Sequence, residues 1–389
     1  MYIWQLDDWK QGDAPAFHWQ SDTLQPLLLQ VEQLQQHLLS KHRALQIESP
    51  KEQSALQLSA AHLDALVQNA LRTSEIEGET LNAESVRSSV INKLGLEQAG
   101  LPKSIKKGTA QTDALAKLLI DATTQHQSPI SVAGLCQWQA MLFTDSPLNE
   151  QVRVGQLRGD ALMQVVSGRI DRPTVHFEAP PRDVLDAELH RFVHWFNNPP
   201  AEMDPYLRSG ITHLWLVTLH PFDDGNGRVT RALTDQALAQ AESTSIRYYS
   251  HSAAIMARRS EYYDTLQQSQ RGSLDITPWL SWYLSVLIDA MQQGQQRFER
   301  VLNKTRFWQQ HSQTVLSERQ VKVLNRLLDN WGEEFIEGIN ASKYKGIAGV
   351  SKATATRELA ELVQKHCLHK LPGGGRSTRY ALVLETTSA

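Results

Sequence analysis

The stretch His220-Pro221-Phe222-Asp223-Asp224-Gly225-Asn226-Gly227-Arg228-Val229-Thr230-Arg231 decides how this chain is interpreted. Apolar residues between Ile211 and Leu219 recur at helical spacing, and they predict a helix that ends near His220 because a residue before proline disfavours helical backbone. A second helix is expected after Gly227, with Val229 on its buried side. The glycine-rich segment therefore lies at a helix N-terminus, where free N–H groups and the helix dipole attract an anion.

The side chains around this turn indicate which anion it binds. Arg228 and Arg231 lie three residues apart on one helix face and supply two guanidinium groups suited to phosphate. Asp224 offers a hard carboxylate oxygen suited to magnesium on a polyphosphate. His220 is the nearby group that can take a proton near neutral pH. The stretch predicts a magnesium–polyphosphate site with a general base beside it.

These residues resemble the signature of the Fic family, His-Pro-Phe-x-Asp/Glu-Gly-Asn-Gly-Arg-x-x-Arg, at all nine fixed positions. The resemblance implies a protein adenylyltransferase that moves AMP from ATP to a Ser, Thr or Tyr hydroxyl of a protein and releases pyrophosphate. It implies that His220 deprotonates the hydroxyl and that Asp224 holds Mg²⁺. It further implies phosphate contacts from the following residues: Gly225, Asn226 and Gly227 at the α-phosphate, Arg228 and Arg231 at the β- and γ-phosphates.

Two further segments resemble parts of the same family. The stretch Met163 to Phe177 is typical of a β-hairpin and sits where the family has a flap that aligns the target segment by main-chain pairing. Thr174, Val175 and His176 are the expected flap contacts, although a plain surface hairpin is the alternative. Tyr262 and Gln270 correspond to the adenine pocket, where the family often has Asn in place of Gln270; an aromatic pair at Tyr262-Tyr263 is also typical of a core.

The segment Thr73-Ser74-Glu75-Ile76-Glu77-Gly78 matches the family's inhibitory pattern, Ser/Thr-x-x-x-Glu-Gly/Asn. The resemblance implies that Glu77 reaches Arg231 and blocks the seat of the ATP γ-phosphate, with Thr73 and Gly78 as the other fixed positions. Its place upstream of the central motif is similar to the class II arrangement. The alternative is a simple helix end capped by Gly78. In some relatives this glutamate supports the reverse reaction, removal of AMP, and the sequence leaves that open.

The last part of the chain looks like a winged helix. Residues 341–380 carry 8 basic and 2 acidic residues, and they predict a helix–turn–helix over Ser342 to Lys365 followed by a glycine-tipped hairpin. In a DNA-binding role, a major groove would face the side chains Lys352, Thr354, Thr356 and Arg357, with Arg376 and Arg379 on the wing. Docking of a protein is the equal alternative.

The expected fold is mainly α: a Fic-type helical bundle with a short β-hairpin flap, followed by a C-terminal α+β winged helix. The expected division is an N-terminal helical domain over 1–100 with the inhibitory helix at about 60–78, a catalytic core over 101–300, a linker helix over 301–315 and the winged helix over 316–389. By analogy with relatives, a homodimer is expected.

Composition narrows the function classes. Of 389 residues 41% are hydrophobic, which excludes a disordered chain, and a net charge of -3 excludes a polycation built for nucleic acid. The two cysteines, Cys136 and Cys367, are too few for a disulfide framework. The N-terminus lacks a signal peptide pattern and no segment predicts a membrane span, so a cytoplasmic protein is expected. Two other functions stay open: a DNA-binding regulator with a nucleotide-sensing core, and an enzyme that uses another nucleotide donor.

Overall fold

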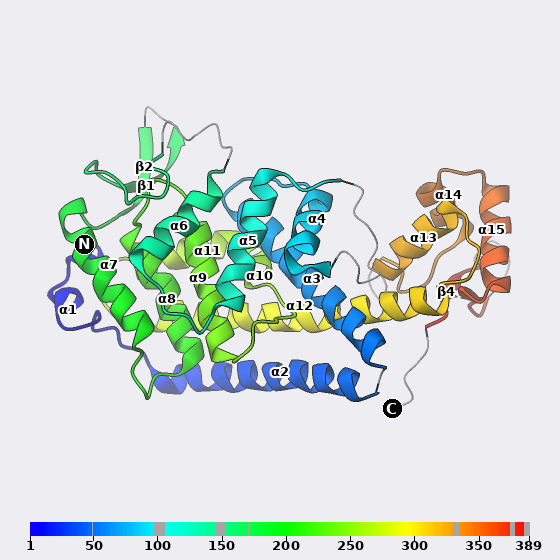
Figure 1. Cartoon of the computed structure of the whole chain (residues 1–389), viewed down its shortest axis with the longest axis horizontal. Coiled ribbons are helices and arrows are strands. Elements are labelled where there is room, and N and C mark those ends of the chain that lie inside the picture. Colours follow the sequence, from blue (N-terminus) through cyan, green and yellow to red (C-terminus); the bar gives the residue numbers. More distant parts are fainter. Residues whose placement is uncertain are drawn as a thin grey trace. The chain divides into compact units, whose positions relative to one another are not determined.

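The structure is a computed structural model that describes residues 1–48, 50–96, 106–144, 152–169, 172–329, 334–373 and 378–384 (Figure 1). Of the sequence predictions, the wing residue Arg376 lies outside these ranges. The chain forms two compact units: residues 1–50 with 62–295, and residues 51–61 with 296–389. Each unit is described by itself.

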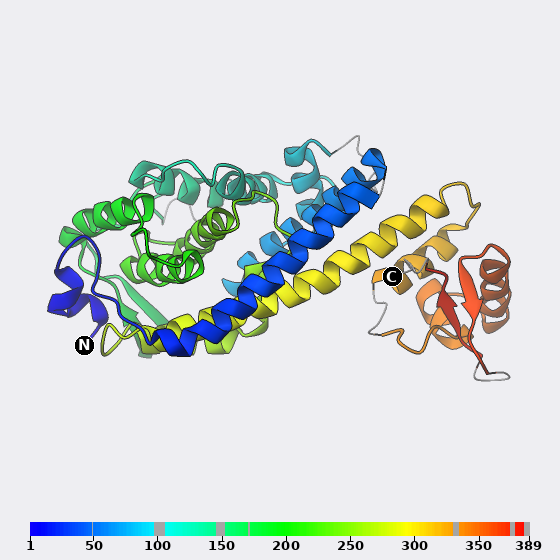
Figure 2. The same ribbon diagram turned by 90° about the horizontal axis from the view of Figure 1, so that it is seen from below.

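The first unit is helical, as the sequence predicts, with one β-hairpin. Its elements are η1 (Ile3–Gln5), α1 (Asp7–Lys10), α2 (Ser21–Glu48), most of α3 (Lys51–Ile76), α4 (Ala83–Leu94), α5 (Ala110–Thr124), α6 (Val132–Leu142), β1 (Gln164–Arg169), β2 (Arg172–Glu178), α7 (Arg182–Asn197), α8 (Pro205–Leu219), α9 (Asn226–Ala241), α10 (His251–Ala257), α11 (Arg259–Ser269) and the first half of α12 (Thr277–Gln310). Helix α2 runs beside this half of α12, where the Gln295 side chain donates to the Leu34 carbonyl over 3.4 Å (Figure 2).

Helices α8 and α9 form the centre of this unit (Figure 1). Every residue of α8 from Tyr206 to Leu219 is buried, which marks a core helix rather than an amphipathic surface helix. Its start is fixed by Asp204, whose carboxylate accepts hydrogen bonds from the first free amides, and by Pro205 at the first helical position. The Trp215 ring of α8 packs edge-on against the rings of Trp9 and Phe17, with ring centres 6.3 Å apart in both pairs. Trp9 thus belongs to the core of the bundle, and Phe17 packs at its edge.

The β-hairpin forms where the sequence predicts the flap. Strands β1 and β2 pair antiparallel from Gln164↔Glu178 to Arg169↔Arg172, with an irregularity between Val165 and Val166. The N-terminal segment closes the end of the hairpin, because the Trp4 indole donates to the Glu178 carbonyl over 2.7 Å. The Ile3 amide, one residue before it, donates to the Gln270 carbonyl over 3.0 Å. Residues 3 and 4 therefore tie the base of the hairpin to the end of α11.

The second unit contains a helix–turn–helix followed by a small sheet (Figure 2). Its elements are α13 (Glu318–Asp329), α14 (Ala341–Ala348), α15 (Lys352–Gln364), β3 (Leu368–Lys370) and β4 (Tyr380–Leu382). Gly349 adopts a left-handed conformation with φ of 67° between α14 and α15, and the Ser351 side chain caps α15. The helices and the strand pair predicted for this region are confirmed, and β3 pairs antiparallel with β4.

A buried carboxylate holds the helices of the second unit together. Glu358 of α15 is 3% exposed, and it accepts hydrogen bonds from Arg319 of α13 over 2.8 Å and from the Tyr344 hydroxyl of α14 over 2.6 Å. The opposite side of α15 is exposed and includes Lys352, Thr356 and Arg357. This exposed side is the one for which the sequence predicts a partner.

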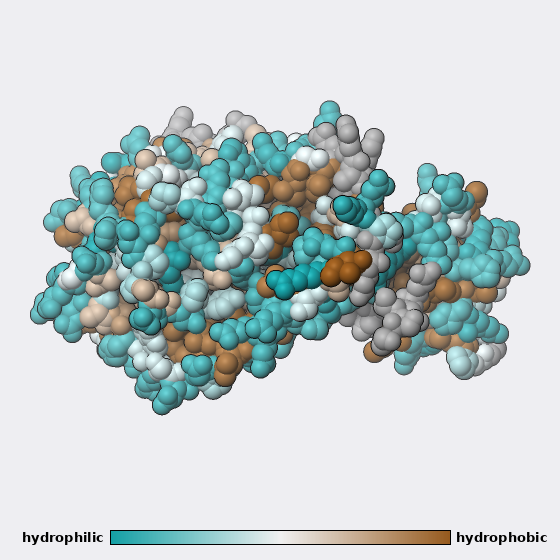
Figure 3. Space-filling view, turned by 60° about the horizontal axis from the view of Figure 1, so that its bottom comes forward, coloured by the Kyte–Doolittle hydropathy of each residue, from teal (hydrophilic) through white to brown (hydrophobic). Residues whose placement is uncertain are grey.

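On the face shown in Figure 3, hydrophilic residues predominate and apolar residues form separate patches between them. None of the helices in the described ranges combines the length and the hydropathy needed to cross a bilayer.

Candidate active site

The loop between α8 and α9 has two left-handed residues. His220 ends α8 with φ of 49° and ψ of 58°, and Gly225 precedes α9 with φ of 90°. Helix α8 ends at the expected position, whereas α9 begins at Asn226, one or two residues earlier than expected. A left-handed conformation costs a residue with a side chain about 1–2 kcal/mol, so His220 needs support from its surroundings.

The His220 imidazole is held as a neutral ring. Its Nδ1 lies 3.3 Å from the Val217 carbonyl, and because a carbonyl can only accept, Nδ1 carries the proton and Nε2 is left with a free lone pair. Burial lowers the pKa of His220 to about 4; the Val217 carbonyl opposes this effect, and the Arg158 charge adds to it. At neutral pH the Nε2 atom can therefore accept a proton.

Side chains that no motif marks brace this loop. Arg158 is 1% exposed and its Nε donates to the His220 carbonyl over 2.9 Å. Gln139 of α6 is fully buried; it donates to the Asp224 carbonyl over 3.2 Å and accepts from the Gly155 amide over 2.6 Å. Sequence reasoning missed both residues, because each lies more than 60 positions from the loop and shares no spacing with it.

Asn226 also braces the loop. Its side-chain oxygen accepts from the Phe222 amide over 2.9 Å, and its side-chain nitrogen donates to the Phe222 carbonyl over 2.7 Å. The sequence prediction assigned this side chain to a phosphate. In the structure both of its ends are engaged by backbone, so its contact is with the loop.

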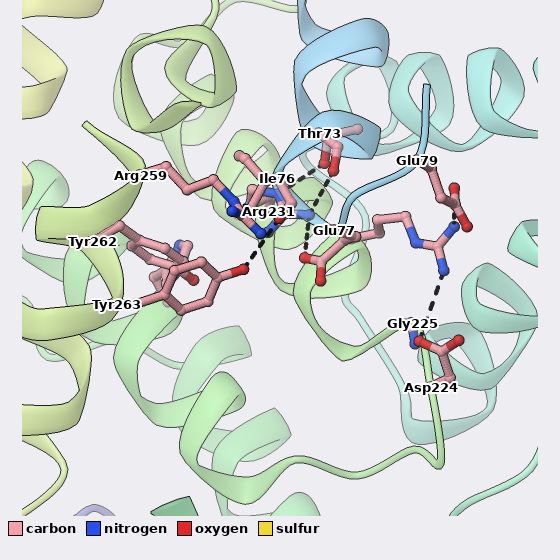
Figure 4. A network of polar contacts seen from close by, with 12 residues as sticks. Thr73, Ile76, Glu77, Glu79, Asp224, Gly225, Arg231, Arg259, Tyr262 and Tyr263 are labelled. Carbon is pink, nitrogen blue, oxygen red and sulfur yellow. Dashed lines mark hydrogen bonds and ion pairs between the residues drawn. The ribbon is translucent and has the colours of Figure 1, made fainter. Parts of the chain in front are cut away.

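The predicted partner of Arg231 is present (Figure 4). The Arg231 side chain is 1% exposed; its Nη2 donates to Glu77 Oε1 over 2.7 Å and to the Thr73 carbonyl over 2.9 Å, and its Nε donates to the Thr73 hydroxyl over 2.8 Å. Gly78 follows with φ of 85° and ends α3, as the sequence predicts. Thr73, Glu77 and Gly78 thus lie together at the end of α3.

The Glu77 carboxylate occupies the N-terminal turn of α9. A Cβ atom added to Gly227 would collide with Glu77 Oε1 and would lie 2.9 Å from Arg231 Nη1. Burial raises the pKa of Glu77, but the charge and hydrogen bond of Arg231, with Arg228 and His220, outweigh burial and hold that pKa below its usual value. An anionic group therefore already fills the position where the sequence predicts a phosphate.

The side of α3 that carries Glu77 faces α9 in a regular pattern. Asn69 contacts Asp235, Thr73 contacts Arg231, and Glu77 lies against Gly227. Both sets of positions are four residues apart and run in opposite directions, as one-turn steps on two antiparallel helices require. The position of Glu77 is thus set by two contacts further along α3.

Arg228 is held by a second carboxylate of the same segment. Its Nη1 donates to Glu79 Oε2 over 2.8 Å, while Asp224 Oδ1 lies 3.8 Å from Nη2. The Arg228 side chain is 5% exposed, and its guanidinium lies 5.7 Å from the centre of the Phe143 ring. Both arginines of the central motif therefore pair with glutamates that follow α3.

A cavity of about 590 Å³ brings together six of the fifteen predicted site residues. Its volume is in the range of small-molecule sites. The residues lining it are His220, Asp223 and Gly227 from the central motif, Glu77, residues 163–166 and 176–177 of the hairpin, and Arg259, Tyr262, Tyr263, Gln267 and Gln270 with their neighbours from α11.

The adenine and flap predictions differ in outcome. Tyr262 and Gln270 line the cavity, and the Tyr262 hydroxyl is engaged by His213 Nε2 over 3.0 Å. His176 also lines it and contacts Gln267 over 3.0 Å. Thr174 and Val175 are in β2 but are not among the lining residues. Tyr263 is the second residue of the predicted aromatic pair, whereas Arg259 was not predicted. Both donate to the Ile76 carbonyl, over 3.2 and 2.9 Å, within the segment 73–78.

Asp224 is the one predicted metal ligand. Its Oδ1 accepts from the Gly225 amide over 2.5 Å, and its side chain is 47% exposed. Within the described ranges, no three His, Cys, Asp or Glu side chains group as a ready-made metal site. A single carboxylate beside an anion site fits Mg²⁺, which is usually bound by one or two carboxylates together with substrate phosphates.

This geometry, a neutral histidine beside an anion-binding helix start and a ligand-sized cavity, defines a candidate nucleotide site. Comparison with known families agrees with the motif: residues 129–238 match the family described as "Fic/DOC family". The central part of the chain is a Fic/DOC family domain. Residues 2–96 match a second family, described as "Domain of unknown function (DUF4172)".

Part of the chain is similar to curated proteins named Fic. The chain is 33% identical over 93 residues to "Protein adenylyltransferase Fic" of Drosophila grimshawi, which is 24% of this chain and 18% of that protein. It is 32% identical over 108 residues to the protein of the same name from Nematostella vectensis, covering 27% of this chain and 23% of that one. The chain thus spans about a fifth of the length of the curated relatives it matches.

One solved structure is similar over nearly the whole chain. It is a Fic family protein from Desulfovibrio desulfuricans G20, with a TM-score of 0.50 at 17% identity, covering 94% of this chain and 97% of that one. At this identity the similarity establishes the fold, and it agrees with the mainly helical Fic-type architecture predicted from the sequence.

Proposed function

We propose that this protein is a self-inhibited protein adenylyltransferase that transfers AMP from ATP to a Ser, Thr or Tyr hydroxyl of a protein. The single observation that carries the proposal is the cavity in which His220, the Gly227 turn and the hairpin meet. The names of the curated relatives support the reaction class. The target protein, which can include the chain itself, is identified here only by its hydroxyl.

The transfer itself needs one base and one anion site. His220 Nε2 takes the proton of the target hydroxyl, and the hydroxyl oxygen forms a bond to the α-phosphorus of ATP. The bond between the α-phosphorus and the bridging oxygen breaks, and pyrophosphate leaves. The amides at the start of α9 and the guanidinium groups of Arg228 and Arg231 stabilise the negative charge on the phosphates. Backbone of the hairpin would hold the target segment across the cavity by strand pairing.

Asp224 would hold Mg²⁺ beside these phosphates. When bound, the metal neutralises phosphate charge and orients the leaving group. The partial exposure of the Asp224 carboxylate leaves room for such a shared ligand set. The residues of this chain supply the remaining phosphate contacts.

The position of Glu77 supports the proposed self-inhibition. Its carboxylate lies on the Gly227 turn and pairs with Arg231, so a polyphosphate must displace it or bind in a different orientation. The carboxylate stays ionised at neutral pH, because its neighbours lower its pKa. Two anions cannot share this turn, which predicts a wild-type enzyme that is nearly silent.

The test uses ATP labelled on the α-phosphate, with Mg²⁺, and four proteins: wild type, Glu77→Gly, Glu77→Gln and Glu77→Gly/His220→Ala. We expect protein labelling by Glu77→Gly, weaker labelling by Glu77→Gln, which keeps the shape but not the charge, and none by the double variant. Equal labelling by wild type and Glu77→Gly would refute the self-inhibition. Absence of label in all four, with cell lysate as target, would favour another nucleotide donor or the regulator function.

A second function rests on the C-terminal unit. We propose that the exposed side of α15, with Lys352, Thr356 and Arg357, binds the backbone of DNA. Its support is the helix–turn–helix geometry and the positive charge of residues 341–380. Retention on duplex DNA that falls steeply as salt rises would support this binding, whereas no retention at low salt would favour docking of a protein.

A further inference from the structure

Arg158 connects two structures that the proposed reaction needs. It lies in the segment between α6 and β1, and its guanidinium donates to two backbone carbonyls: His220, over 2.9 Å, and Pro180, which follows β2 by two residues. Its own amide donates to the Pro221 carbonyl over 2.9 Å. One side chain thus joins the start of the α8–α9 loop to the end of the hairpin.

The position of Arg158 makes it more than a general core residue. The last carbonyl groups of a helix have no hydrogen-bond donor within the helix and carry partial negative charge. A buried guanidinium supplies both a donor and a compensating positive charge. His220 adopts a left-handed conformation that its side chain disfavours, and a contact to its own carbonyl opposes relaxation. Because a planar guanidinium presents donors in a fixed fork, it holds two carbonyls at a set separation, which a lysine cannot reproduce.

We propose that Arg158 is a positioning residue that fixes the His220 imidazole relative to the hairpin, so that a hydroxyl presented by the hairpin meets His220 Nε2. This inference rests on the proposed function. Arg158 is not among the residues that line the cavity, so it acts through the two carbonyls rather than on ATP or the target. A displacement of about 1 Å between base and hydroxyl can cost on the order of 100-fold in rate.

The test places Arg158→Met and Arg158→Lys in the Glu77→Gly background. We expect kcat for AMP transfer to fall on the order of 100-fold in Arg158→Met, with KM for ATP changed by no more than about threefold, because the phosphate-binding residues are untouched. Arg158→Lys keeps the charge and one donor, so it should recover part of kcat. The acid limb of the pH profile should move to higher pH in Arg158→Met and less in Arg158→Lys, since the Arg158 charge lowers the pKa of His220.

The matched control is Arg208→Met in the same background. Arg208 is 7% exposed and donates to the Phe196 carbonyl over 2.7 Å from the first turn of α8, at the opposite end of that helix from His220. Arg208→Met should lower the melting temperature about as much as Arg158→Met does, but it should leave kcat and the pH profile of AMP transfer unchanged. If kcat falls equally in both variants, or if Arg158→Met retains full kcat, the inference is overturned.

An activity-free measurement separates this inference from the proposed function. NMR titration of the His220 imidazole in Arg158→Met should give a higher pKa than in the Glu77→Gly parent, and Arg158→Lys should lie between them. If the parent transfers no AMP, the proposed function fails, and this titration decides whether Arg158 sets the environment of His220. An unchanged His220 titration in Arg158→Met would overturn the inference.

Discussion

The side-chain amide of Asn69 donates to the Asp235 carboxylate over 2.6 Å, one helical turn before Thr73 and one turn after Arg231 on the facing helix. Both side chains are buried, and Asp235 also pairs with Arg247. Of the three contacts between α3 and α9 at four-residue spacing, the Asn69–Asp235 contact is the farthest from the cavity. It therefore helps hold Glu77 in place without lining the cavity.

Asn69→Leu should weaken self-inhibition from a distance. A hydrogen bond to a buried charged group contributes about 1.5–3 kcal/mol, and its loss should lower the free energy of unfolding by a similar amount. We expect AMP labelling severalfold above wild type but below that of Glu77→Gly. Ser209→Ala is the control: it removes a buried hydrogen bond to Tyr283 without touching α3, and it should lower stability without raising labelling.

Glu79→Gln should activate weakly. Glu79 pairs with Arg228, but its side chain is 37% exposed, and exposed ion pairs contribute only about 0–1 kcal/mol. We expect a gain of about two- to fivefold in labelling. In the Glu77→Gly background the same substitution should lower the KM for ATP by releasing Arg228. An effect as large as that of Glu77→Gly would show that Arg228, and not Arg231, is the arginine whose pairing limits ATP binding.

The pH dependence of the Glu77→Gly enzyme should be nearly flat from about pH 5.5 to 8. Burial lowers the pKa of His220 to about 4, so the base is already deprotonated throughout this range. Removal of the Glu77 charge, which favours protonation of His220, should not raise that pKa. An acid limb with a midpoint near the ordinary histidine value, about 6.5, would contradict this environment for His220.

Acid should destabilise the fold through the buried His251 as the pH falls below about 6.5. Burial lowers the pKa of His251 to about 4, with a further contribution from Arg247 and Arg231 that Asp235 opposes. The unfolded chain binds this proton below about pH 6.5 and the folded chain does not, so stability falls as pH drops from 6.5 toward 4. At pH 5 this one residue should cost about 2 kcal/mol. As the pH is lowered from 6.5 to 5, the melting temperature of wild type should fall more than that of His251→Phe. An equal fall in the two proteins would contradict the prediction.

Removal of magnesium should abolish labelling by Glu77→Gly. Asp224→Asn keeps an acceptor for the Gly225 amide but removes the negative charge of the ligand, and we expect a loss on the order of 100-fold at fixed Mg²⁺. Raising the Mg²⁺ concentration should recover part of that loss. Full activity of Asp224→Asn, or activity in excess EDTA, would rule out this carboxylate as the metal ligand.

The sequence alone predicted the parts of this site whose signal is local. The turn around Gly225, the hairpin after Met163 and the helix end at Gly78 each carry their own spacing or turn residues, and the structure has all three. The partnership of Glu77 with Arg231 came from resemblance to a family rather than from spacing, because 154 residues separate the two.

The rest depends on tertiary contacts without a sequence pattern. Arg158, Gln139 and Asn69 each make a contact across more than 60 residues, and a single buried polar residue in a helical or loop segment has no spacing that marks its partner. Asn226 shows that a residue can be recognised in the sequence while its contacts cannot. Its place in the motif is plain in the sequence, but the hydrogen bonds that engage both ends of its side chain appear only when the loop is folded.

The attachment of the first residues to the cavity walls affects how this protein should be prepared. Ile3 and Trp4 hold the carbonyls of Gln270 and Glu178, and these belong to the two walls between which the nucleotide would lie. Proteolytic removal of Ile3 and Trp4 would break both contacts and loosen both walls together. Silence or activity measured on such a preparation would report on these lost contacts as much as on Glu77.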